Sequence, residues 1–300
     1  LKGDHAGDEA REDGEFRLLL RDGAGRESIA AAEVVIDATG VYGNHNSAGA
    51  SGIPAVGEQV AADAIEYGLP DVLGRDRDRY AGKKVLVVGA GYSAATSVVA
   101  LAALAREAPG TETAWITRRS PATNGGPIAA IDRDRLAERD RLTREANALA
   151  GGASSAVDYR PGTMIDRIDR CANGRLAVRL VGGSTDTIDV DRIVANVGYR
   201  PDNRLYAELQ VHECYASGGP MKLAAALLGR PSADCLDQAP HGPQSLFTPE
   251  PDFYILGSKS YGRNSRFLLS VGLTQIRDLF SIIGDRADLD LYRTMGAQAG

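Results

Sequence analysis

The chain has 300 residues, of which 43% are hydrophobic and 25% are charged, with a formal net charge of -6. This composition excludes disordered and fibrous proteins and leaves room for two domains with separate cores. The negative charge disfavours a nucleic-acid partner, and no apolar run reaches the roughly 18 residues needed to span a bilayer. We therefore expect a soluble protein with neither a nucleic-acid nor a membrane partner, and its three unpaired cysteines favour a reducing cytoplasm.

The N-terminal part contains two β-type segments. Residues 15–21 and 33–38 predict a meander that ends at Ala38-Thr39-Gly40, and the Gly- and Asn-rich stretch 41–57 is typical of a surface loop. The chain starts with Leu1 and a polar stretch rather than with a helix or a signal sequence. We expect from this that the true N-terminus is missing.

The middle of the chain contains a strand, a helix and a strand in immediate succession. Residues 85–88 are a continuous apolar run, 93–106 are rich in helix formers, and 113–117 are again apolar. This order predicts a βαβ unit with a parallel sheet.

The second half alternates between strands and helices. A helix is expected over 131–150, an antiparallel meander over 164–169, 175–181 and 186–190, a helix over 221–228, a strand over 252–257 and a final helix over 267–283. The three cysteines, Cys171, Cys214 and Cys235, form no CxxC pair, which favours free thiols over a disulfide or zinc site.

A glycine motif lies at the first strand-to-helix junction of the βαβ unit. Gly89, Gly91 and Ala94 match GxGxxA, with Tyr92 and Ser93 opening the helix. The first glycine allows a tight turn, the second lets a pyrophosphate approach the helix N-terminus, and the alanine permits close packing. The motif indicates a dinucleotide site, and the alternative is an ordinary tight turn.

The end of the second strand bears on the choice of nucleotide. An acidic residue would bind the ribose hydroxyls of NAD there, but the sequence has Thr117-Arg118-Arg119-Ser120. Two guanidinium groups suit the 2′-phosphate of NADPH. The alternative is that Arg118 and Arg119 only cap a strand in solvent.

The order of motifs resembles flavoproteins with two dinucleotide-binding domains, of the thioredoxin-reductase-like and flavin-monooxygenase-like types. The motifs are VVIDATG, GAGYSA, ITRR, ANVGYRPD and FYILGSKSYG, followed by a helix with SVGLTQIRD. The resemblance implies an α/β fold in which a three-layer, Rossmann-like NAD(P)-binding domain with antiparallel meanders is inserted in an FAD-binding domain. The implied segments are 1–80 and 201–300 for the FAD domain and 81–200 for the inserted domain.

The resemblance also implies positions around the cofactors. Thr39, Gly40 and Gly257 would lie near FAD, and Gly272, Leu273 and Gln275 would face the isoalloxazine from the last helix. Gly89, Gly91, Tyr92, Ser93 and Ala94 would hold the pyrophosphate of NADPH, and Arg118 and Arg119 its 2′-phosphate. No metal site is expected, and no side chain is assigned as a catalytic acid or base.

Three features depart from the family pattern. An Asp usually follows the glycine of the returning strand, whereas this chain has Gly257-Ser258-Lys259. No GxGxxG precedes the ATG strand, which we attribute to truncation, and no FxGxxxHxxx motif lies between residues 40 and 83. The missing Asp favours the monooxygenase-like branch or a divergent group, whereas the missing FxGxxxHxxx motif disfavours Baeyer–Villiger and flavin-containing monooxygenases, so the subfamily stays open.

Two polar clusters lie in the C-terminal third. His212, Glu213, Cys214 and Tyr215 form either a substrate-side loop with Cys214 near the flavin or a helix-capping loop with a buried thiol. Lys259 belongs to a polar loop that the resemblance places against the flavin or its phosphates.

The sequence thus predicts an oxidoreductase that passes a hydride from NADPH to FAD and then to oxygen or an organic acceptor. A small-molecule substrate is expected, and a homodimer is allowed for. The alternatives are a flavin-free NADP-dependent reductase and a non-catalytic dinucleotide-sensing protein.

Overall fold

The computed structural model describes residues 2–5, 7–121, 125–229, 235–237 and 241–294. The chain divides into two compact units: a central unit of residues 45–198 and an outer unit of residues 1–44 and 199–300. None of the helices in the described ranges is long and apolar enough to cross a membrane.

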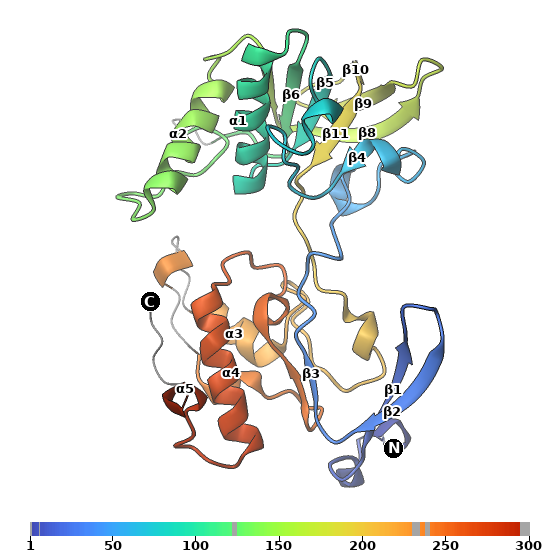
Figure 1. The fold of residues 1–300 in the computed structure, drawn as a ribbon, viewed down its shortest axis with the longest axis vertical. Coiled ribbons are helices and arrows are strands. Elements are labelled where there is room, and N and C mark those ends of the chain that lie inside the picture. The colour runs from blue at the N-terminus through green and yellow to red at the C-terminus, as the bar shows by residue number, and fades with distance from the viewer. Residues whose placement is uncertain (1, 6, 122–124, 230–234, 238–240, 295–300) are drawn as a thin grey trace. The chain divides into compact units, whose positions relative to one another are not determined.

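The central unit is built on a five-stranded parallel sheet with two layers packed against it. The strand order is β4 (Ile65–Glu66), β11 (Arg192–Ala195), β5 (Lys84–Val88), β6 (Glu112–Thr117) and β7 (Val157–Pro161). Figure 1 shows α1 (Tyr92–Glu107) and α2 (Ala137–Ala150) side by side on one face. An antiparallel sheet of β8 (Thr163–Arg170), β9 (Leu176–Gly182) and β10 (Thr187–Val190) covers the other face.

Successive side chains along the central strands point to opposite faces of the sheet and fill the core on both sides. Val85 and Val87 of β5 pack in the cluster beneath α1, whereas Leu86 packs in the cluster beneath the antiparallel sheet. On β6, Trp115 lies on the helix side and Ile116 on the other. The strands are buried on both faces, which explains their continuous apolar sequence.

Residues 45–80 belong to the central unit, so its first boundary lies at residue 45 rather than near the expected residue 80. The physical reason is that β4 extends the parallel sheet beside β11. In addition, Ala48 and Ala55, from the stretch expected to be a surface loop, are buried in the same core as Ile165.

The start of α2 also differs from the expected one. The helix begins at Ala137 instead of at residue 131. Asp134 accepts a hydrogen bond from the Leu136 backbone N–H and forms an ion pair with Arg139, which fixes a non-helical turn before the helix. Arg133 has a φ of 52°, which a continuous helix does not allow.

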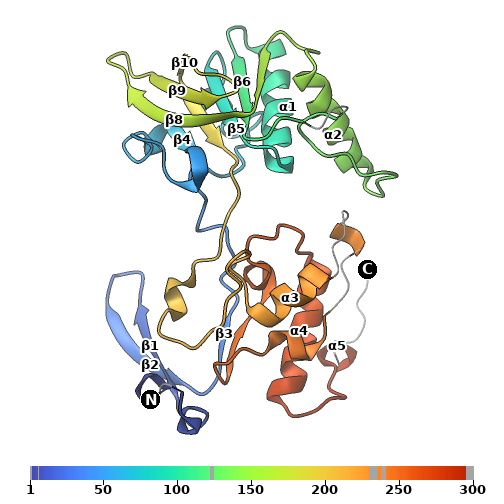
Figure 2. The ribbon, with the colours of Figure 1, turned by 180° about the vertical axis from the view of Figure 1, so that it is seen from behind.

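The outer unit contains an antiparallel hairpin, β1 (Phe16–Arg21) and β2 (Glu27–Ala32), and a separate parallel pair, β3 (Val35–Asp37) and β12 (Phe253–Ile255). The expected meander of residues 15–21 with 33–38 is therefore wrong: β2 is the partner of β1, and β3 pairs instead with a strand more than 200 residues away. Figure 2 shows this arrangement from behind.

Helices complete the outer unit. The helices are α3 (Met221–Gly229), α4 (Leu269–Ile283) and α5 (Leu291–Thr294). Tyr254 of β12 packs towards α4 beside Leu279, whereas Phe253 and Ile255 pack with Phe16 and Tyr206 on the other face. Short 3₁₀ helices occur in both units. Those of the outer unit are Lys2–Asp4, Glu9–Arg11, Asn203–Tyr206, Cys235–Asp237, Pro243–Leu246 and Gly257–Tyr261, and those of the central unit are Ala50–Gly52, Ala62–Ala64 and Arg77–Arg79.

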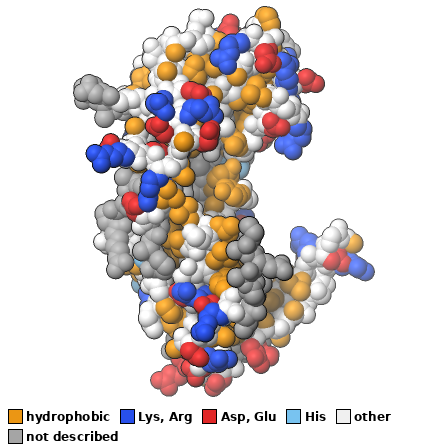
Figure 3. All heavy atoms as spheres, turned by 60° about the vertical axis from the view of Figure 1, so that its left-hand side comes forward, with side chains coloured by type: hydrophobic (Ala, Val, Ile, Leu, Met, Phe, Trp, Pro, Cys, Tyr) orange, Lys and Arg blue, Asp and Glu red, His pale blue; other side chains and the backbone are white. Residues whose placement is uncertain are grey.

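Charged side chains of both signs are interspersed over the surface shown in Figure 3. The described part of that surface therefore shows no extended patch of a single charge.

Candidate functional site

The turn between β5 and α1 has a geometry that only glycine accommodates at its first position. Gly89 has a φ of 141°, and a Cβ on it would lie 2.4 Å from the carbonyl oxygen of Asn196 and 3.4 Å from the Cβ of Ala94. The Asn196 side chain is itself fixed, because it donates to the Gly68 carbonyl and accepts from the Ser97 hydroxyl. The buried Ala94 must be small for the same close packing.

The second glycine of the turn faces open space. A Cβ on Gly91 would meet no atom within 4 Å, and Gly91, Tyr92 and Ser93 are all exposed. Gly91 is the N-cap of the 16-residue helix α1, and no side chain caps the first N–H groups. These backbone donors at the positive end of the helix fit an approaching pyrophosphate.

The two arginines after β6 are exposed and available. Arg118 and Arg119 lie at the carboxyl end of the strand that neighbours β5, and no acidic side chain in the described ranges forms an ion pair with either. Most other arginines of the central unit pair with acids, for example Arg160 with Asp158 and Asp186. The structure therefore brings the glycine turn and the arginine turn to the same edge of the sheet, where α/β proteins bind ligands.

In the outer unit, the expected flavin-side residues lie at the carboxyl ends of β3 and β12. Gly40 and Gly257 have φ angles of 72° and 70°, and a Cβ on Gly40 would lie 3.5 Å from the Ser258 hydroxyl. Thr39 is exposed and donates through both its N–H and its hydroxyl to Asp37. Two adjacent glycine turns at the ends of parallel strands leave backbone accessible and fit one edge of a flavin nucleotide.

A buried ion pair holds these two turns together, and sequence reasoning missed it. Lys259 Nζ lies 2.5 Å from Asp37 Oδ2, and the two side chains are 1% and 0% exposed. The ammonium also donates to the Thr39 hydroxyl at 3.2 Å and to the Asp202 carbonyl at 2.8 Å. The only sequence signal was the Gly257-Ser258-Lys259 stretch, in which Ser258 stands where the family pattern has an Asp and a lysine follows it.

Of the three residues of α4 that were expected to face an isoalloxazine, Leu273 is exposed, whereas Gly272 and Gln275 are buried. Gly272 is buried, and a Cβ on it would lie 2.8 Å from the Phe267 ring, so its small size serves internal packing. Leu273 is exposed on the same helix. The Gln275 side chain accepts from the Gly257 N–H at 2.9 Å and donates to the Ser260 hydroxyl at 2.9 Å.

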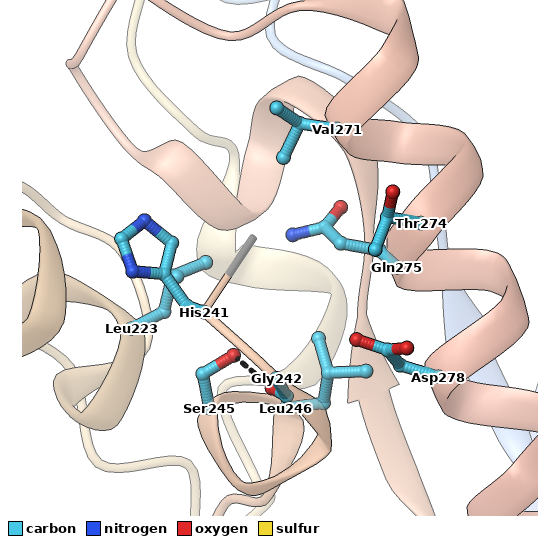
Figure 4. A pocket seen from close by; sticks show the side chains of 9 residues that line it. All are labelled: Leu223, His241, Gly242, Ser245, Leu246, Val271, Thr274, Gln275 and Asp278. Carbon is cyan, nitrogen blue, oxygen red and sulfur yellow. Dashed lines mark hydrogen bonds between the residues drawn. The ribbon is translucent and has the colours of Figure 1, made fainter. Parts of the chain in front are cut away.

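Gln275 thus fixes the turn after β12 instead of presenting its amide to solvent. Figure 4 shows it beside a small hollow between α3, α4 and the 3₁₀ helix Pro243–Leu246. Asp278 and Thr274 of α4 line the same hollow.

The loop before α3 contains a buried thiol. Cys214 is 8% exposed, its N–H donates to the Gly219 carbonyl, and its own carbonyl accepts from Gly218. Hydrogen bonds from the side chain and the backbone of Ser217 hold the pKa of the Cys214 thiol below its ordinary value. The structure therefore has the buried-thiol arrangement, while Tyr215 beside it is fully exposed.

The sequence matches the family profile described as pyridine nucleotide-disulphide oxidoreductase over residues 7–219. The chain belongs to this family. The family membership and the α/β, Rossmann-like fold expected from the motif order are thereby confirmed. Family members are flavoproteins that use FAD with a pyridine nucleotide, so the protein is assigned to the flavoprotein oxidoreductases.

Solved structures of such enzymes share the fold. The bacillithiol disulfide reductase of Bacillus cereus has a TM-score of 0.63 and 17% identity, covering 90% of this chain and 67% of its own. The thioredoxin reductase of T. acidophilum has a TM-score of 0.55 and 14% identity, covering 89% and 74%. The FAD-bound cadaverine monooxygenase of desferrioxamine biosynthesis in Erwinia amylovora has a TM-score of 0.55 and 13% identity, covering 91% and 65%.

The chain spans between 65% and 74% of the length of these three structures. No curated protein sequence matches it.

Proposed function

We propose that the protein uses NADPH to reduce FAD and passes the electrons to oxygen or to an organic small molecule. The observation that carries the NADPH assignment is the pair of exposed arginines, Arg118 and Arg119, at the end of β6 without acidic partners. An NAD-specific site would have a carboxylate near this position, and a phosphate dianion would be repelled by it. Guanidinium groups instead form charge-assisted hydrogen bonds with phosphate.

Different residues of the central unit would bind different parts of the nucleotide. The N–H groups after Gly91 would bind the pyrophosphate, because they are uncapped and lie at the positive end of α1. Gly89 shapes the turn, and its close packing against Asn196 keeps that shape fixed. The arginines would then select the nucleotide through its 2′-phosphate.

In the outer unit, Thr39, Gly40 and Gly257 would lie against the flavin, with their turns fixed by Lys259 and Gln275. The flavin, when bound, supplies the redox chemistry, and the protein supplies placement and electrostatics. No described side chain is needed as an acid or base for this role.

The acceptor we propose is oxygen or an organic molecule, because this sequence offers no cysteine pair that would relay electrons to a disulfide. None of the three cysteines in this sequence forms a CxxC pair, and Cys171 and Cys214 are both free in the structure. The low exposure of Cys214 further limits its access to a large disulfide substrate.

Replacement of both arginines tests the nucleotide assignment. Arg118→Ala/Arg119→Ala should weaken NADPH binding by about 2 kcal/mol or more, roughly 30-fold in Kd, and NADH binding far less. The control variant is Arg106→Ala, which removes an exposed arginine at the opposite end of α1. Titration calorimetry with both nucleotides measures the effect, and an equal loss for NADPH and NADH would refute the assignment.

A further inference from the structure

The side chains on one face of β6 are hydrogen-bonded to both nucleotide-binding turns. Trp115 is fully buried, and its indole N–H donates to the Gly89 carbonyl at 2.8 Å. Two residues further along the strand, and therefore on the same face, the buried Thr117 donates from its hydroxyl to the Arg119 carbonyl at 2.9 Å. The single strand β6 thus fixes one backbone carbonyl in the glycine turn and a second backbone carbonyl in the arginine turn.

Tyr159 of β7 joins these two contacts. It lies directly opposite Trp115 in the parallel pair, with the ring centroids 5.0 Å apart. Its hydroxyl is 2.8 Å from the Thr117 hydroxyl. A threonine hydroxyl has one proton, and Thr117 gives it to the Arg119 carbonyl, so Tyr159 must be the donor to Thr117.

We infer that Thr117 and Tyr159 are positioning residues that make the site selective for a 2′-phosphate. The inference rests on the proposed function, because it assigns these residues to the recognition of NADPH. Arg118 and Arg119 are exposed, and a long exposed side chain loses conformational freedom when it binds a ligand. With the Arg119 carbonyl held in place, the backbone from which both arginines project is already ordered before the nucleotide arrives.

The contacts of Trp115, Thr117 and Tyr159 also set the position of the arginine turn relative to the glycine turn. The contacts run from the Gly89 carbonyl to Trp115, through its ring contact to Tyr159, and through the two hydroxyls to the Arg119 carbonyl. A pyrophosphate and a 2′-phosphate on one nucleotide have a fixed range of separations. Buried contacts that fix both turns therefore favour ligands that carry both groups.

A purely structural role makes a different prediction. If the hydroxyls only satisfy buried polar groups, their removal lowers stability and affects all adenine nucleotides alike. The two roles are separated by adenosine 2′,5′-bisphosphate and 5′-AMP, which differ only in the 2′-phosphate and need no flavin for binding.

The experiment is calorimetric titration of the full chain with these two ligands. Thr117→Val should weaken adenosine 2′,5′-bisphosphate about 5-fold and 5′-AMP less than about 2-fold, while Thr117→Ser, which keeps the hydroxyl, should restore wild-type binding. Tyr159→Phe should act in the same direction, and it provides a second test if the valine variant fails to fold. The matched control is Thr111→Val, which removes another buried hydroxyl, one that donates to the Ala108 carbonyl at the other end of β6.

The outcomes separate the two proposals. A wild-type protein that binds both ligands equally refutes the NADPH assignment itself. The positioning role alone is refuted if the wild-type protein prefers the 2′-phosphate ligand and Thr117→Val and Tyr159→Phe leave this preference unchanged. This includes the case in which the variants lower the affinity for both ligands by the same factor. The only tryptophan of the sequence is Trp115, so its fluorescence confirms in each variant that this strand is still packed.

Discussion

Replacing Lys259 with methionine should strongly destabilise the outer unit. The substitution keeps the volume of the side chain and removes the ammonium, which leaves the Asp37 carboxylate buried without its counter-ion and the Asp202 carbonyl without its donor. Because both side chains are 1% exposed or less, water cannot replace the lost contacts. Breaking one partner of such a pair costs about 3–5 kcal/mol.

The double variant Asp37→Asn/Lys259→Met should recover much of this loss, since it removes both charges. The control Lys83→Met, at an exposed position just before β5, should change the free energy of unfolding by less than about 0.5 kcal/mol.

Urea unfolding followed by far-UV circular dichroism measures the effect on the whole chain, and Trp115 fluorescence reports separately on the central unit. We expect the single variant to shift the dichroism transition and to leave the fluorescence transition in place. The reasoning would be refuted if Lys259→Met lowered the free energy of unfolding by less than about 1 kcal/mol. It would also be refuted if the double variant lost as much stability as Asp37→Asn and Lys259→Met do in sum.

Three further variants test other parts of the structure. Gly89→Ala should lower the free energy of unfolding by about 2 kcal/mol or more and abolish nucleotide binding, because its Cβ would overlap the carbonyl of Asn196; normal binding in calorimetry would contradict this. Glu58→Gln should cost about 1–3 kcal/mol in fluorescence-monitored urea unfolding, because the buried carboxylate accepts two backbone N–H bonds and a phenol hydroxyl that one amide oxygen cannot all satisfy; wild-type stability would disprove it. Ser217→Ala should raise the pKa of the Cys214 thiol, because the hydroxyl donor to the thiolate is lost while the backbone N–H of residue 217 remains. Iodoacetamide alkylation followed by peptide mass spectrometry should then reach half its maximal rate at a higher pH, and an unchanged profile would count against the assigned cause.

The elements that the sequence predicted well are those with local signals. The βαβ unit was expected at 85–88, 93–106 and 113–117, and the structure has β5, α1 and β6 within one residue of these bounds at every end. A buried parallel strand and an alanine-rich helix are visible in any short window of sequence. The antiparallel strands of residues 163–190 were found for the same reason, through their alternation.

The elements that were missed depend on partners far away in the chain. β4 and β7 are short edge strands of the central sheet, and they exist because β11 and β6 offer them a pairing edge. The pairing of β3 with β12 likewise cannot be read from either segment alone.

The same distinction applies to the site. The glycines and arginines of the proposed nucleotide site were recognisable from a motif at fixed spacing. The contact between Lys259 and Asp37 joins residues 222 positions apart, and that between Thr117 and Tyr159 joins residues 42 apart, with no local pattern to mark either. These positioning contacts became visible only with the fold.

The visible absorption spectrum of the protein expressed from its complete gene, recorded during anaerobic titration with NADPH and then with NADH, tests the central claim most directly. The account predicts the bands of an oxidised flavin, bleached by NADPH at much lower concentrations than by NADH. A colourless protein that does not take up FAD, or a flavin that NADH bleaches as readily as NADPH, would contradict it.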